Sequence, residues 1–158
     1  MRISNLMVSK RKKKVVSKCK SDPQRHLVYS MEREICGWAV YAHVELDDLQ
    51  RIADYVCRRY RVKRVGIAIE NRGKERVFGW CSDNTIHLNA DYHGDNTAVL
   101  AHELAHYIND QLSPDGESHG PEFVHYYGEI LDMLNLFPYG LFALLCDSWG
   151  VDIGLEEE

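Results

Sequence analysis

The sequence predicts an α+β fold in which helices pack around a small antiparallel sheet. Apolar residues recur at three- and four-residue steps in several segments, and this is the period of an amphipathic helix. Between two of these segments, residues 65–90 contain three short apolar runs that read as strands. Polar clusters at 71–73 and 82–84 separate the runs and suit hairpin turns. We therefore expect the three strands to pair as an antiparallel sheet.

Each element has its own justification. Leu49, Ala53 and Val56 are typical of the helical spacing in the second segment. Pro138 and Gly140 interrupt the chain before the last segment. The expected elements, in order, are helices at 24–36 and 45–60, strands at 65–70, 76–81 and 85–90, and helices at 97–111, 121–135 and 141–149.

Length and composition favour one compact enzyme-sized domain. The chain has 158 residues, of which 45% are hydrophobic and 27% charged, and these values are ordinary for a globular protein. We expect a single domain over 22–158, with no membrane span and no signal peptide. The five cysteines are odd in number and widely spread, which favours free thiols in a reducing, cytoplasmic compartment.

Charge is divided unevenly along the chain. Residues 1–20 contain eight basic residues and no acidic ones, whereas the rest contains 11 basic and 24 acidic residues. A run of this kind is typical of a disordered, solvated arm, here predicted over 1–21. It also allows nonspecific contacts of residues 10–20 with nucleic-acid phosphates. The acidic remainder argues against a nucleic-acid groove on the domain itself.

The strongest functional signal is the sequence His-Glu-Leu-Ala-His at 102–106. Residues four apart on a helix lie on the same face, so His102 and His106 can bind one metal ion. Zinc is the usual metal of this motif, and Glu103 beside the first histidine is placed to act as general base on water. Asp95 or Asn96 can cap the helix that carries the motif.

A catalytic zinc usually takes three protein ligands and keeps one position open. His119 is the better candidate for the third ligand, because Gly120 and Pro121 suit a turn into the next helix. Glu122, one turn further in, is the alternative ligand; otherwise it is a carboxylate favoured by the helix dipole.

Several other polar residues are candidates for supporting roles. Tyr126, Tyr127, His125 and His93 are candidates for a group that stabilises the transition state, and spacing selects none of them. Asp110, one turn beyond His106, is either an orienting partner of a ligand or an exposed carboxylate. If the strand at 85–90 borders the cleft, an extended substrate peptide can pair with it.

Two stretches resemble known families. His102-Glu103-x-x-His106 with the later His119-Gly120-x-x-Phe123 looks like the SprT-like zinc metallopeptidase core, a zincin-like fold. Asp22-Pro23-Gln24-Arg25, with Val28-Tyr29 and Glu32, resembles the opening of a family of small zinc metallohydrolases of actinobacteria and their phages. The resemblance spans roughly residues 22 to 150 and implies His102, His106 and His119 as zinc ligands. The chain has no Cys-x-x-Cys pair, so a DNA-repair role is not implied.

The sequence therefore predicts a zinc-dependent hydrolase, most simply a metallopeptidase acting on a peptide or protein. The alternative is a zinc-containing binding module with little turnover, associated with nucleic acid through its basic tail. Glu103 speaks against that alternative, because zinc binding alone does not require it.

Overall fold

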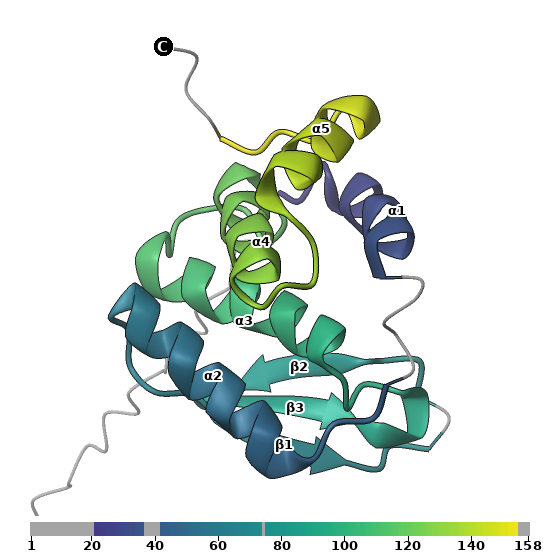
Figure 1. Cartoon of the computed structure of the whole chain (residues 1–158), viewed down its shortest axis with the longest axis vertical. Helices are drawn as coiled ribbons and strands as arrows, with labels where there is room; N and C mark the ends of the chain where they lie inside the picture. Colours follow the sequence, from purple (N-terminus) through teal and green to yellow (C-terminus); the bar gives the residue numbers. More distant parts are fainter. Residues whose placement is uncertain (1–20, 37–41, 74, 155–158) are drawn as a thin grey trace, which may run out of the picture.

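The computed structural model describes residues 21–36, 42–73 and 75–154, and it confirms the α+β class (Figure 1). Nearly all of the predicted basic tail lies outside these residues, so its role stays a prediction. The described elements are α1 (Arg25–Cys36), α2 (Leu46–Tyr60), β1 (Gly66–Glu70), β2 (Gly79–Ser82), β3 (Thr85–Asn89), the 3-10 turn η1 (Ala90–Tyr92), α3 (Thr97–Leu112), α4 (Pro121–Met133) and α5 (Tyr139–Trp149).

Helix α3 is the central element of the domain. The sheet lies on one side of α3 and α4 lies on the other (Figure 1). Most of its residues are buried, because apolar side chains occur on nearly every face of the helix. Asn96 caps it as expected: the Asn96 side-chain oxygen accepts a hydrogen bond of 2.9 Å from the Val99 amide. The predicted active-site motif thus lies on a buried helix.

The sheet is mixed, so the prediction of an antiparallel sheet is wrong in part. The strand order is β1-β3-β2, with β3 antiparallel to β2 and parallel to β1. Residues 82–84 do form the predicted hairpin turn between β2 and β3. Residues 71–73 do not connect neighbouring strands, because the segment after β1 crosses to the other side of β3.

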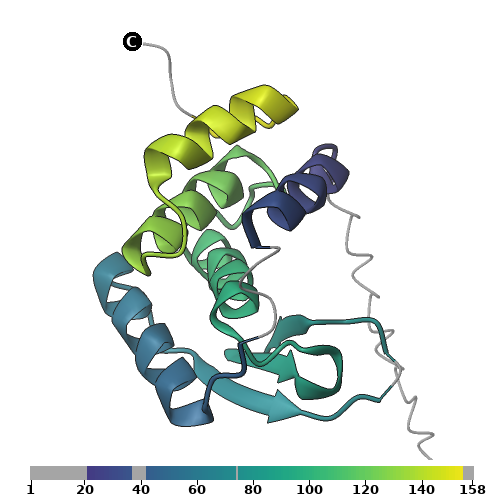
Figure 2. The same ribbon diagram turned by 45° about the vertical axis from the view of Figure 1, so that its right-hand side comes forward.

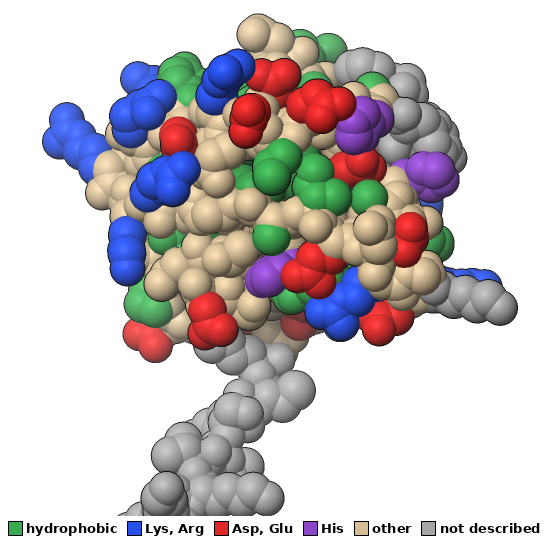
Figure 3. All heavy atoms as spheres, turned by 90° about the horizontal axis from the view of Figure 1, so that it is seen from below, with side chains coloured by type: hydrophobic (Ala, Val, Ile, Leu, Met, Phe, Trp, Pro, Cys, Tyr) green, Lys and Arg blue, Asp and Glu red, His purple; other side chains and the backbone are tan. Residues whose placement is uncertain are grey.

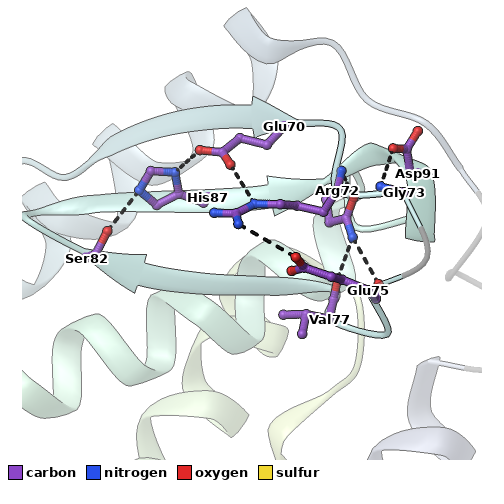
Figure 4. A network of polar contacts seen from close by, with 9 residues as sticks. Glu70, Arg72, Gly73, Glu75, Val77, Ser82, His87 and Asp91 are labelled. Carbon is purple, nitrogen blue, oxygen red and sulfur yellow. Dashed lines mark hydrogen bonds and ion pairs between the residues drawn. The ribbon is translucent and has the colours of Figure 1, made fainter.

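A buried asparagine, Asn89, bonds the segment that makes this crossing. The Asn89 side chain accepts a hydrogen bond from the Arg72 amide (3.1 Å) and donates to the carbonyl oxygens of Glu75 (3.3 Å) and Val77 (2.9 Å). Asp91 accepts a further bond of 2.7 Å from the Gly73 amide (Figure 4). These bonds satisfy the backbone of the connecting segment, so it need not pair as a hairpin strand.

The strand order also determines which edge is available for pairing. Because β3 is central and paired on both sides, the prediction that an added peptide pairs with the strand at 85–90 is wrong. At the outer edge of β1, Gln50 of α2 occupies backbone groups: its side chain bonds the Val65 oxygen (3.0 Å) and the Ile67 amide (2.9 Å). No strand within the described ranges pairs with the outer edge of β2.

Helix α1 closes the opposite end of the domain beside α5 (Figures 1 and 2). Met31 and Cys146 are both buried where the two helices meet. Gln24 ties the start of α1 to two distant segments: its side chain bonds the His119 oxygen (2.9 Å) and the Asp152 amide (3.0 Å). Helix α1 is therefore anchored directly to the segment that carries His119.

The surface of the domain carries both signs of charge. On the face shown in Figure 3, acidic and basic side chains are interspersed, and no continuous basic surface appears there. No helix in the described part of the chain is long and apolar enough to cross a membrane.

Candidate metal centre

Helix α3 brings the first two predicted ligands together. The Nε2 atoms of His102 and His106 lie 3.1 Å apart, on successive turns of the helix. His102 is only 6% exposed. Two imidazole nitrogens that face each other at this distance in a buried setting can share one metal ion.

The turn before α4 brings the third predicted ligand, His119, to the same place. His119 is buried, and its ring centroid lies 4.6 Å from that of His106 and 5.5 Å from that of His102. One ligand atom from each of the three histidines lies within 4.8 Å of the others. Glu122, the alternative third ligand, is exposed and does not belong to this cluster. The predicted set of three histidines is therefore the one that the fold assembles.

A carboxylate orients His119. Asp22 accepts a hydrogen bond of 2.9 Å from His119 Nδ1 and another of 3.1 Å from the His119 amide. With Nδ1 engaged in this way, Nε2 is the nitrogen that points into the cluster. Carboxylate–histidine pairs of this type fix the tautomer of metal-binding histidines and raise their basicity.

A second carboxylate orients His102. Glu32 of α1 accepts hydrogen bonds of 2.8 Å from His102 Nδ1 and from the Tyr127 hydroxyl. Burial raises the pKa of the Glu32 carboxyl, but attraction to His102 and these two hydrogen bonds outweigh it and hold the pKa below its usual value. Glu32 is thus ionised and directs His102 Nε2 toward His106.

The cluster has the properties that a bound cation requires. His119 Nε2 is buried and has no hydrogen-bond partner among the described residues, which is costly unless another group satisfies it. Burial, followed by repulsion from His102, His119 and Arg25, lowers the pKa of His106 to about 2, so its ring stays neutral. Burial lowers the pKa of His102, but attraction to Glu32 and the hydrogen bond with it outweigh burial and raise the pKa, so metal binding at His102 releases a proton. Imidazoles with one nitrogen fixed by a carboxylate are usual metal donors. The residues therefore fit a metal ion.

Glu103 lies at the edge of this cluster, against the sheet. It is 8% exposed, and a Cβ atom built on Gly79 of β2 would lie 3.0 Å from its Cγ atom. The absence of a side chain at Gly79 therefore leaves space for Glu103. Burial raises the pKa of Glu103, which makes its carboxylate a stronger proton acceptor than an exposed glutamate.

Tyr126 and Tyr127, the predicted candidates for stabilising the transition state, have other contacts in the structure. Tyr127 is fully buried, and its hydroxyl donates to Glu32, so it supports a ligand. The Tyr126 ring packs against Tyr60 with centroids 5.7 Å apart, and its hydroxyl lies 3.4 Å from Ser113 Oγ.

His125, His93 and Asp110 also lie apart from the cluster. His125 lines a separate cleft of about 720 Å³ between α2, α4 and α5, where its Nδ1 lies 2.9 Å from the Tyr139 hydroxyl. His93 follows η1 in a left-handed conformation and is exposed. Asp110 is exposed, and the carboxylates that bond the ligand histidines are Asp22 and Glu32 instead.

Helix α1 and the residues just before it supply partners of the cluster that spacing alone did not identify. Asp22 and Glu32 lie 97 and 70 residues from the histidines they orient. Arg25 and Tyr29 lie between them on the same segment, beside the cluster. The only available signal was the resemblance at 22–32, which names these residues without giving them a contact.

Removing the carboxylate of Asp22 is expected to weaken zinc binding without unfolding the protein. We expect Asp22→Ala to lower zinc affinity about 10–100-fold, the usual effect of losing a partner that orients a metal ligand. Competition with a chelating dye measures this, and thermal unfolding of the metal-free protein checks the fold. Asp115→Ala, an exposed carboxylate in the loop before His119, is the matched control. Equal affinities for the two variants would contradict an orienting role for Asp22.

Comparisons with known proteins add no family. No protein-family model, curated protein or solved structure matches the chain significantly. The resemblance to zinc metallopeptidases thus stays a prediction from residues 22–32, 102–106 and 119–123. What the structure adds is a cluster of three histidines suited to a metal ion.

Proposed function

We propose that this protein is a zinc-dependent hydrolase that cleaves peptide bonds. The observation that carries the proposal is the joint placement of three histidines and one buried glutamate. One ring nitrogen from each of the three histidines lies within 4.8 Å of the others, and Glu103 follows His102 on the same helix. Three imidazole ligands that leave one position open are the donor set of a catalytic, rather than a structural, zinc site, and Glu103 is the adjacent carboxylate.

The chemistry divides between the metal and the chain. Zinc in such a site supplies Lewis acidity, both for a carbonyl group and for water. Glu103 would accept the proton of the attacking water at its carboxylate and pass it to the nitrogen of the departing amine. Asp22 and Glu32 hold the histidine rings, so these reacting groups need not reorganise during the reaction.

The position of β2 supports a peptide as the substrate. β2 is an edge strand, and Gly79 in it contacts the Glu103 side chain. An extended peptide that pairs with the outer edge of β2 would run past Glu103 and use backbone hydrogen bonds that any sequence can make. This binding mode takes the place of the one expected for the strand at 85–90.

Removing and restoring the metal tests the proposal. The purified chain is expected to contain about one zinc per molecule and to cleave members of a fluorescence-quenched peptide library. A chelator should abolish the cleavage, and one equivalent of zinc should restore it. Mass spectrometry of the metal content and fluorescence measure the two quantities. A protein that binds no zinc after reconstitution would contradict the proposal.

A further inference from the structure

One wall of the histidine cluster is formed by Tyr29 of α1. Its ring stacks on that of His102, with centroids 5.6 Å apart and an angle of 18° between the planes. It also lies 5.1 Å from the ring of His119 at a tilt of 53°. Tyr29 is nevertheless 36% exposed, so one side of its ring covers the cluster and the other meets solvent. Tyr29 therefore lies between the cluster and the outside of the molecule.

Arg25 lies one helical turn before Tyr29, on the same side of α1. Its guanidinium carbon is 5.6 Å from the centre of the Tyr29 ring, in cation–π contact. The positive charge of Arg25 contributes, after burial and other causes, to lowering the pKa of both His106 and His119. The guanidinium therefore lies within electrostatic range of two ligands.

No carboxylate neutralises this arginine within the part of the chain that the structure describes. The carboxylates nearest in sequence, Asp22 and Glu32, are bonded to the two histidines. Arg33 of the same helix bonds Ser30 and faces elsewhere. A guanidinium is a rigid fork of donors that matches the two oxygens of a carboxylate. Arg25 is thus a cation held by an aromatic ring beside the cluster and ready to pair with an anionic group.

We propose that Arg25 binds a carboxylate of the substrate close to the bond that is cleaved, and that Tyr29 holds the guanidinium in place. The inference rests on the proposed function and deepens it, because it names the class of substrate: peptides with a carboxylate near the scissile bond. That carboxylate is either the C-terminus of the peptide or the side chain of an acidic residue.

Paired metal-binding ligands test this without a known substrate. Each pair consists of a hydroxamate with a terminal carboxylate and the same molecule with a carboxamide in its place, with one to three methylene groups between the ends. The full chain is loaded with cobalt, whose visible spectrum changes when a hydroxamate binds. At the best chain length, we expect the carboxylate to bind at least tenfold more tightly than the carboxamide, an ordinary gain for one charge-assisted contact.

The variants separate this contact from the metal site. Arg25→Gln should abolish the preference and leave the affinity for the carboxamide within about twofold, because only the carboxylate meets the guanidinium. Tyr29→Phe keeps the aromatic ring and should retain most of the preference, whereas Tyr29→Leu should lose most of it. Arg33→Gln, on the same helix, is the control and should behave like the unmodified chain.

The outcomes distinguish the two proposals. Hydroxamates that bind equally well with either end group, or a preference that survives in Arg25→Gln, would contradict the role of Arg25 and leave the metal site intact. A chain that takes up no cobalt would overturn the proposed function and this inference with it.

Tripeptide competitors then identify the source of the carboxylate. One has a free C-terminus, and the other has an amidated C-terminus and an aspartate. If neither tripeptide displaces the hydroxamate, the proposal is contradicted for peptides.

Discussion

Glu103→Gln is expected to abolish peptide hydrolysis and to leave zinc bound. The amide has nearly the same size as the carboxylate, so it fits the space beside Gly79, but it does not accept a proton from water. General acid–base catalysis contributes about 10²–10⁴-fold to rates, so kcat/KM should fall by at least about 100-fold. The measurements are kcat/KM on the best library peptide and the zinc content of the same sample.

Glu122→Gln provides the control for this variant. Glu122 is an exposed carboxylate in the first turn of α4, and it does not belong to the histidine cluster. The same change of charge there should leave both kcat/KM and zinc content unchanged. Glu103→Gln with more than a tenth of the original activity would show that Glu103 is not the base.

The comparison between Glu103→Gln and the unmodified chain also separates an enzyme from a binding module. If both bind one zinc and neither cleaves any peptide in a broad library, the metal serves binding and the hydrolase proposal fails. The hydrolase proposal has one physical argument in its support. Burial of Glu103 costs free energy and raises its pKa, and a metal held only for structure gains nothing from that cost.

The parts of the site that could be predicted are those governed by local geometry. The i, i+4 relation of His102 and His106 follows from the period of a helix. Asn96 caps that helix through a hydrogen bond with the amide of Val99, three residues further on. His119 was identified because Gly120 and Pro121 indicate where the next helix begins. In each case the signal lies within a few residues of the feature.

The parts that could not be predicted depend on contacts distant in sequence. The segment that crosses from β1 to β2 is bonded by one buried side chain, Asn89, whose three backbone partners lie 12 to 17 residues away. The pairing of Asp22 with His119 and of Glu32 with His102 requires α1 to pack against the other end of the chain. Periodicity describes the face of a helix and does not identify what that face will meet.

The same reasoning applies to the tyrosines. Tyr126 and Tyr127 follow the third histidine closely in sequence, so they were candidates for contact with the substrate. Helix α4 instead points Tyr127 inward to Glu32 and Tyr126 toward Tyr60. The tyrosine beside the cluster, Tyr29, comes from a helix about 70 residues earlier than α3. Residues that line one site need not be neighbours along the chain.

His119→Ala is expected to remove zinc from the protein at concentrations where the unmodified chain is fully loaded. Structural sites with four ligands bind zinc with about 10–16 kcal/mol of apparent free energy, or roughly 3 kcal/mol for each ligand. Loss of one of three ligands should therefore weaken binding by about 100-fold or more. Mass spectrometry measures the zinc content, and a competing chelator gives the affinity. His125→Ala, a histidine of α4 that lines the separate cleft, should keep its zinc.

Thermal unfolding gives an independent reading of the same change. A ligand present at 100 times its Kd stabilises the folded state by about 2.7 kcal/mol, so zinc should raise the Tm of the unmodified chain and of His125→Ala. Zinc should leave the Tm of His119→Ala nearly unchanged under the same conditions. Without metal, His119 Nε2 is a buried nitrogen with no partner among the described residues, and its removal offsets part of the loss of the hydrogen bond between His119 Nδ1 and Asp22. If His119→Ala keeps a full zinc complement and an undiminished shift of Tm, His119 is not the third ligand. Glu122 is then the first residue to examine in its place.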